Sequence, residues 1–332
     1  MTLANEPKLQ IENGIYAIAG ISKNSGKTSF LNWLLAMLNG RAIGVLTTGR
    51  DGEDIDLVYG NPKPAVKLIA NTLFSSTSES IDKLGSAVEV LQKLPFLAGT
   101  KKLWLLKALR DIETEIVGPA NVQAQIQTAE FMQSCGAEII LIDGSLDRKS
   151  IALSNQIKGV FLVVGGSFGT LDKINTELTR LIQLSQIHKG KLQAKLQNLN
   201  NISYFRDNQW DELGINSLLG NTQDIIAALA EIKPDKIYFP GAVTDSVFNG
   251  IKPALKEIKD IFVKHPLQLH LNKSNLDYLV ANHGIHAIEP FNIIAVSLNS
   301  WSVKGNHLDS CILRDNIRKQ FPLVTVVDIC EV

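Results

Sequence analysis

One short segment of this chain combines glycines, a lysine and hydroxyl residues in a pattern that suits phosphate binding. Residues 18–30 read IAGISKNSGKTSF, and Gly26 is followed directly by Lys27 and Thr28. A glycine-containing loop that leads from a strand into a helix can wrap its backbone N–H groups around a phosphate. The common spacing places four residues between the two glycines, whereas Gly20 and Gly26 have five between them. We therefore expect a phosphate-binding loop that is one residue longer than usual.

The residues on either side favour such a loop over a chance Gly-Lys-Thr triplet. The apolar run 14–20 is typical of a buried strand, and residues 27–39 place leucines at helical spacing before Gly40. Lys27 is then expected to reach the β- and γ-phosphates, and the Thr28 hydroxyl to hold Mg²⁺. The alternative is an ordinary helix capped by Ser25, with Lys27 in solvent. The predicted nucleotide-binding residues are Gly20, Ser22, Lys23, Asn24, Ser25, Gly26, Lys27, Thr28 and Ser29.

Acidic residues follow two other predicted strands. Asp143 ends the apolar run AEIILID (137–143), where a carboxylate can bind Mg²⁺ directly or through water. Asp51 and Glu53 lie in TTGRDGEDID (47–56), and either could bind Mg²⁺ or position a water molecule. The alternatives are a turn residue at 143 and a solvated acidic turn at 47–56. We expect Lys27, Asp143 and Glu53 to serve catalysis, and Thr28, Asp51 and Asp143 to serve as metal ligands.

Continuous apolar strands that alternate with helical segments predict an α/β fold. Strands of this kind are typical of a mostly parallel sheet with helices on both faces, here a P-loop sheet. Residues 86–118 break the alternation and are expected to form a small antiparallel insertion. The predicted domains are a nucleotide-binding domain at 1–190, an irregular polar connection at 191–220 and a C-terminal α/β unit at 221–332. This last unit offers a surface for a partner.

Composition excludes several other classes of protein. The 332 residues carry 33 basic and 33 acidic side chains, so the formal net charge of zero gives no indication of nucleic acid or an acidic membrane as a partner. No apolar run approaches the ~20 residues of a membrane helix, and the polar start lacks a signal-peptide core. The three cysteines are far apart in sequence, unlike a disulfide framework or a zinc site. A cytoplasmic location is expected.

The longer loop spacing resembles that of the dethiobiotin synthetases and the cobyrinic acid a,c-diamide synthases. Both belong to a branch of P-loop proteins that also contains the MinD and nitrogenase-iron-protein type. The resemblance covers about the first 170 residues and rests on the loop and two supporting strands. It implies ATP or GTP as the ligand, with Mg²⁺. A member that is a ligase would use ATP to activate a small carboxylate as an acyl phosphate.

Several further stretches resemble the small subunit of the lysine 5,6-aminomutase reactivase. They are AGISKNSGKTS (19–29), GVLTTGRDGED (44–54), EIVGPAN (115–121), LIDGS (141–145), YFPGAVTD (238–245) and FPLVTVVDI (321–329). The resemblance implies a slow ATPase that works with a second ATPase subunit to restore a cobalamin-dependent mutase. A nucleotide-driven partner protein is thus the favoured interpretation. The alternatives are a ligase of the dethiobiotin or cobyrinate kind and a nucleotide-binding scaffold that does not hydrolyse.

Overall fold

The chain folds into two compact units. The computed structural model describes residues 9–48, 50–51, 65–145, 151–190, 196, 198–300 and 308–329. Unit 1 consists of Met1–Ile174 and Ile293–Val332, and unit 2 consists of Asn175–Asn292. Unit 2 is therefore inserted in the sequence of unit 1. In the described part of the chain, no helix combines the length and the apolar character that crossing a membrane requires.

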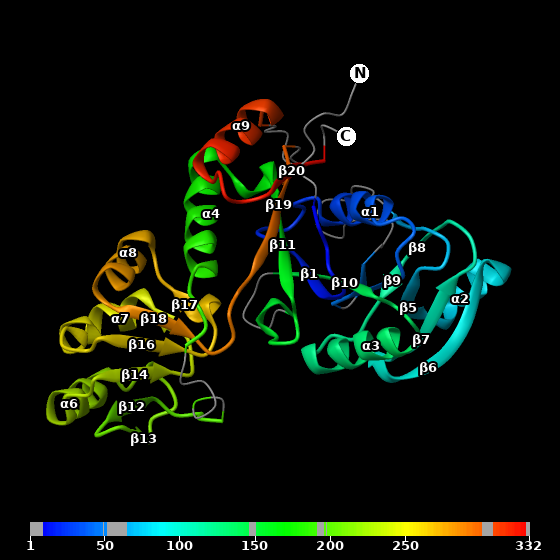
Figure 1. The fold of residues 1–332 in the computed structure, drawn as a ribbon. Helices are drawn as coiled ribbons and strands as arrows, with labels where there is room; N and C mark the ends of the chain where they lie inside the picture. Colours follow the sequence, from blue (N-terminus) through cyan, green and yellow to red (C-terminus); the bar gives the residue numbers. More distant parts are fainter. Residues whose placement is uncertain are drawn as a thin grey trace. The chain divides into compact units, whose positions relative to one another are not determined.

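A nine-stranded sheet forms the centre of unit 1 (Figure 1). Neighbouring strands are parallel from β20 to β5, and the last two pairs, β5–β7 and β7–β6, are antiparallel. The order across the sheet is β20 (Val326–Asp328), β19 (Ile293–Asn299), β11 (Gly159–Gly165), β1 (Gly14–Gly20), β10 (Ile139–Ser145), β2 (Ile43–Thr47), β5 (Leu73–Thr77), β7 (Lys101–Ala108) and β6 (Val88–Ala98).

Helices α1 (Lys27–Met37) and α3 (Val122–Ser134) lie on opposite faces of this sheet. Ile139 and Leu141 of β10 belong to the cluster of buried side chains that includes α1. The intervening Ile140 faces the other way because strand side chains alternate. On that second face, a Cβ atom at Gly44 would lie 2.8 Å from Sδ of Met132 in α3 and 3.1 Å from Cγ1 of Ile140.

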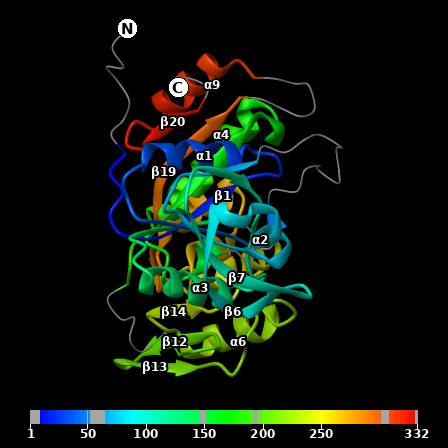
Figure 2. The same cartoon turned by 90° about the vertical axis from the view of Figure 1, so that its right-hand side faces the viewer.

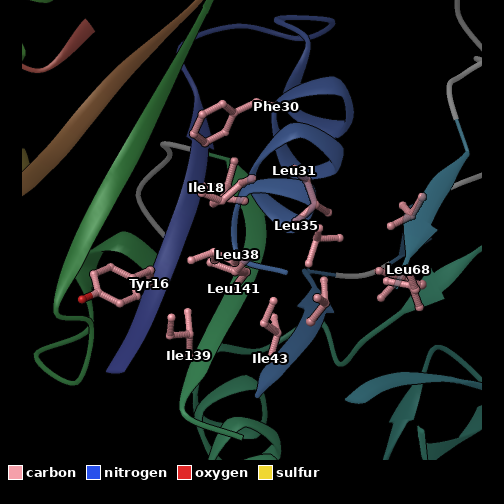
Figure 3. Close-up of a cluster of buried hydrophobic side chains, with 14 of the residues drawn as sticks. Tyr16, Ile18, Phe30, Leu31, Leu35, Leu38, Ile43, Leu68, Ile139 and Leu141 are labelled. Atoms are coloured by element: carbon pink, nitrogen blue, oxygen red, sulfur yellow. The ribbon is translucent and has the colours of Figure 1, made fainter. Parts of the chain in front are cut away.

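The packing of α1 fixes where the segment before it must lie. Phe30, Leu31, Leu34 and Leu35 are buried at helical spacing, and Figure 3 shows three of them beside the central strands that carry Ile18 and Leu141. Burying each such side chain contributes roughly 1.5–3 kcal/mol. The helix ends before Gly40, whose φ of 91° stops it as the sequence predicts.

Shorter elements complete unit 1. Figure 2 shows α2 beside the antiparallel strands β6 and β7. The two-stranded pair β3–β9 lies near the carboxyl end of β2. The shorter elements are β3 (Arg50–Asp51), β4 (Val66–Leu68), α2 (Ser78–Leu84), β8 (Ile112–Thr114), β9 (Ile116–Val117), α9 (Ser310–Gln320) and the helix α4 (Leu171–Ser185), along which the chain passes into unit 2.

Unit 2 has a five-stranded sheet of its own, in the order β13-β12-β14-β16-β18. Strands β14, β16 and β18 are parallel, and β12 and β13 form an antiparallel hairpin at the edge. Its elements are β12 (Ser203–Arg206), β13 (Gln209–Glu212), α6 (Thr222–Ile232), β14 (Lys236–Phe239), β15 (Val243–Thr244), α7 (Asp245–Ile251), β16 (Asp260–Val263), β17 (Leu269–His270), α8 (Lys273–Asn282) and β18 (Gly284–Ala287).

The predicted α/β architecture with a large, mostly parallel sheet is confirmed, and two predicted boundaries differ from the structure. Residues 293–332, expected in a C-terminal unit at 221–332, return to unit 1, where β19 and β20 extend the first sheet. The connection expected to be irregular at 191–220 contains the β12–β13 hairpin. Its turn residues Asp207 and Asn208 have positive φ values of 50° and 64°, the conformation that a tight two-residue hairpin requires.

The predicted antiparallel excursion at 86–118 also differs in its relation to the sheet. Strands β6 and β7 are antiparallel as expected, but they continue the edge of the main sheet rather than forming a separate element. The hairpin turns at Gly99, which has a φ of 59°. The sequence Arg110-Asp111-Ile112 suggests a possible hairpin within 86–118, but these residues lead from β7 into β8, and β8 pairs with β4.

Candidate functional site

The predicted phosphate loop connects β1 to α1 and has an unusual backbone. The Ile21 N–H donates to the carbonyl of Val163 at 3.1 Å, and the first helical bond runs from Phe30 N–H to the Gly26 carbonyl at 3.0 Å. Between them, Asn24 and Gly26 have left-handed φ values of 56° and 94°. Asparagine and glycine tolerate this region best. Left-handed residues two positions apart curl the chain so that successive N–H groups can point into one hollow.

The N–H groups of this loop lack partners within the described structure. None of the eight groups from Ser22 to Ser29 donates a hydrogen bond of ordinary geometry to a described residue. The residue at the amino end of α1 is Gly26, and no side chain caps the helix. The alternative of an ordinary helix capped by Ser25 is therefore not what the structure shows. A curled row of donors at the positive end of a helix dipole is an arrangement that binds anions.

The hollow of the loop is lined by polar groups. A Cβ atom at Gly20 would overlap Ser25 Oγ and would lie 3.1 Å from the Ser22 carbonyl oxygen. It would also lie 3.3 Å from Cδ of Lys27, so the lysine side chain folds back across the loop toward the end of β1. Ser25 is 1% exposed, and the hydroxyl oxygens of Ser22 and Ser25 are buried without a hydrogen-bond partner in the described structure. Such groups favour a polar ligand in the hollow.

Two neighbouring strands support the loop from their carboxyl ends. At the end of β11, a Cβ atom at Gly165 would lie 2.6 Å from Cα of Ser25, so glycine permits this close approach. Ser167 donates a hydrogen bond to the carbonyls of Lys23 and Asn24, each at 3.2 Å. At the end of β19, the side chain of Asn299 lies against Gly26, where a Cβ atom would overlap Asn299 Nδ2.

Sequence reasoning identified part of this support. By its sequence, the glycine-rich stretch VVGGSFGT (163–170) could shape a nucleotide pocket or move, and the alternative is a flexible turn; nothing in it singles out Ser167. No sequence pattern linked Asn299 to the loop, because the predicted domains placed residues 293–299 in the C-terminal unit rather than in the nucleotide-binding domain. A prediction of the strand order would have been needed to bring the end of β19 next to the loop.

Asp143 lies on the strand next to the loop. Strand β10 runs parallel to β1, with Asp143 in register with Ile18 and Ser145 in register with Gly20. The residue is 2% exposed, and its carbonyl accepts hydrogen bonds from Thr48 N–H at 2.8 Å and Thr47 Oγ1 at 3.3 Å. Because Asp143 is within the strand, it is not the turn residue of the alternative interpretation. Because β1 and β10 are parallel and end in register, this carboxylate and the loop both lie at the carboxyl ends of the strands.

The residues present fit a nucleotide with Mg²⁺. Thr28 is half-buried in the first turn of α1, and Asp143 supplies a buried carboxylate at the same sheet edge. Hydroxyl and carboxylate oxygens are ligands that Mg²⁺ prefers, together with phosphate oxygens and water. No group of three histidine, cysteine or acidic side chains elsewhere in the described ranges suits a metal ion. A nucleotide bound here would have to supply most of the metal's ligands itself.

The other predicted acids receive no structural placement of their side chains. The backbone of Asp51 belongs to β3, which pairs with β9 through Asp51 and Ile116. Its side chain, like all of Glu53, lies outside the described residues, so their predicted roles remain predictions.

Unit 2 contains a different polar cluster, at the amino ends of its parallel strands. Asp260 accepts a hydrogen bond from His286 at 2.9 Å and pairs with Lys236 at 3.3 Å. Burial alone would raise the pKa of Asp260, but these two partners lower it below its usual value. The His286 ring also stacks on Phe262, with 4.7 Å between ring centroids. Because Asp260 is satisfied by these two neighbours on adjacent strands, we interpret the cluster as one that stabilises the sheet of unit 2.

Comparison with known proteins gives no match, either in a scan of family models or in a search of curated proteins.

The geometry of the hollow gives a first testable prediction. We expect Gly20→Ala to lower the free energy of unfolding by about 1–3 kcal/mol, because the new methyl group must displace the Ser25 hydroxyl. Urea unfolding measures this change. Removing that hydroxyl should relieve the overlap, so the double variant Gly20→Ala/Ser25→Ala should be more stable than the sum of the two single changes predicts. A Gly20→Ala protein as stable as wild type would contradict the described loop.

Proposed function

We propose that the chain binds a nucleoside triphosphate with Mg²⁺ at the loop between β1 and α1 and hydrolyses it slowly. One observation carries the proposal: eight successive N–H groups, Ser22 to Ser29, lack described partners while the Lys27 side chain folds back over them. A solvated loop of this kind would be unusual without an anion, because neighbouring N–H dipoles repel one another when they converge. A polyphosphate offsets that repulsion with negative charge.

Each residue of the site has a distinct part in this proposal. The N–H groups of the loop would orient the phosphates by charge-assisted hydrogen bonds, and Lys27 would neutralise charge that develops on the β- and γ-oxygens. Thr28 and Asp143 would hold the metal ion, Asp143 directly or through water. When bound, Mg²⁺ would act as a Lewis acid and neutralise negative charge on the phosphates. ATP and GTP both suit the loop, since its contacts are to phosphate.

The proposed role of hydrolysis is to change the shape that a partner recognises. Both segments that connect unit 1 to unit 2 begin or end beside the loop: α4 follows the turn that contains Ser167, and β19 ends with Asn299. A change in the loop therefore has a direct mechanical route to unit 2. The resemblance to the aminomutase reactivase supports a second ATPase subunit and a cobalamin-dependent mutase as the partners. The ligase of a small carboxylate remains the second candidate.

The binding step is tested at Lys27. We expect Lys27→Ala to weaken Mg·ATP binding roughly 10- to 150-fold, since a charge-assisted hydrogen bond contributes about 1.5–3 kcal/mol. Titration calorimetry measures the affinity. Lys83→Ala is the matched control, because that lysine is exposed and belongs to α2 rather than to the loop. Equal affinity of the wild type and Lys27→Ala would contradict nucleotide binding at this loop.

The metal ion is tested at Asp143. We expect Asp143→Asn to retain nucleotide binding without metal and to lose most Mg²⁺-dependent hydrolysis, because the amide has a similar size but lacks the charge that Mg²⁺ requires. Phosphate release measured across a Mg²⁺ titration reports the effect. An unchanged Mg²⁺ requirement would assign the ligand role to an acid of residues 51–56 instead.

The purpose of hydrolysis is tested by what stimulates it. We expect slow phosphate release by the purified chain and faster release with a protein partner, most of all a second ATPase subunit together with a cobalamin-dependent mutase. A panel of small carboxylic acids forms the comparison arm. If turnover requires a small acid, converts that acid and ignores every protein, the chain is a ligase.

A further inference from the structure

Ser167 contacts the phosphate loop without facing its hollow. It lies in the short turn Gly166–Phe168 between β11 and α4. Its hydroxyl oxygen is 3.2 Å from the Lys23 carbonyl oxygen and 3.2 Å from the Asn24 carbonyl oxygen. A hydroxyl group has one proton, so the two carbonyls share it as a bifurcated hydrogen bond. The contact therefore fixes two successive peptide groups at once.

The direction of those carbonyls determines the direction of two N–H groups. The peptide bonds from Lys23 to Asn24 and from Asn24 to Ser25 are trans. In a trans peptide the C=O of one residue and the N–H of the next point to opposite sides. Because both carbonyls turn toward Ser167, the N–H groups of Asn24 and Ser25 point away from it. These are two of the eight donors that lack described partners.

The backbone around this contact leaves little freedom for the peptides to rotate. Asn24 is in the left-handed region, with a φ of 56°. The Gly165 backbone lies against Ser25 so closely that a Cβ atom at Gly165 would be 2.6 Å from Ser25 Cα. Replacing Ser167 by alanine would remove the hydroxyl group that donates to the Lys23 and Asn24 carbonyls. It would leave the close packing of Gly165 against Ser25 in place. The hydroxyl thus acts on orientation rather than on the position of the chain.

We propose that Ser167 is a positioning residue of the nucleotide site, which turns the Asn24 and Ser25 N–H groups toward the phosphates by holding the carbonyls of Lys23 and Asn24. This inference rests on the proposed function. The ligand it concerns is the polyphosphate part of a nucleotide. The same contact joins the loop to the turn that precedes α4, so phosphate binding and the start of α4 are linked through one hydroxyl group.

The test compares Ser167→Ala with Ser167→Thr, which retains the hydroxyl. Titration calorimetry with Mg·ATP should show about three- to tenfold weaker binding for Ser167→Ala, the loss expected for one neutral, partly solvated hydrogen bond. Ser167→Thr should bind within about twofold of wild type. The matched control is Ser185→Ala, which removes a serine hydroxyl that donates to the Ile182 carbonyl at 2.8 Å within α4. It should bind Mg·ATP as wild type does.

A second measurement separates positioning from a general loss of structure. In amide NMR spectra, addition of Mg·ATP should shift the Asn24 and Ser25 signals less in Ser167→Ala than in wild type, while the Lys27 and Thr28 signals shift by similar amounts in both. Equal binding and equal shifts in wild type and Ser167→Ala would overturn the role of Ser167 and leave the nucleotide site standing. A wild-type chain that binds no Mg·ATP would overturn the proposed function and this inference with it.

Discussion

The rest of unit 1 is arranged around a row of backbone N–H groups that have no hydrogen-bond acceptor among the described residues. Every helix leaves its first donors unsatisfied, and here the loop before α1 adds several more. Such a row does not persist by its own stability, because the chain could turn these groups toward carbonyls or solvent. It persists because its two ends are fixed by packing. Strand β1 lies at the centre of a nine-stranded sheet, and α1 is anchored on that sheet by Phe30 and three leucines.

The ends of β11 and β19 then restrict the conformation of the loop between β1 and α1. Gly165 and Gly26 allow the ends of β11 and β19 to approach the loop more closely than any other residue would. Ser167 and Asn299 supply the polar contacts on either side of that approach. Rigid support of this kind is what a binding site requires, since donors that are already oriented lose little entropy when a ligand arrives. Under the proposed function, the stability of the central sheet would therefore contribute to the affinity of the loop for phosphate.

The local sequence was sufficient to predict the strand and the helix that flank the loop, but not the strands and side chains that lie next to it. The strand at 14–20, the helix beginning at Lys27 and the stop at Gly40 follow from periodicity and glycine chemistry, which act over a few residues. The position of β19 does not, because an apolar parallel strand has the same pattern in whichever sheet it lies. The β12–β13 hairpin was missed for another reason. Its asparagine and glutamine content suggested an irregular segment, although Asp207-Asn208 is a credible tight turn.

The insertion of unit 2 between α4 and β19 gives the support of the loop a second consequence. The chain passes from unit 1 to unit 2 within α4, after Ser167, and it returns to unit 1 at the start of β19, before Asn299. Ser167 lies four residues before Leu171, the first residue of α4, and Asn299 is the last residue of β19. A ligand can change the shape of a protein only as far as it binds one arrangement more tightly than another. Under the proposed function, any difference in how the loop binds a triphosphate and its hydrolysis product would act first on these two contacts. It would then act on the two segments of chain that connect unit 1 with unit 2.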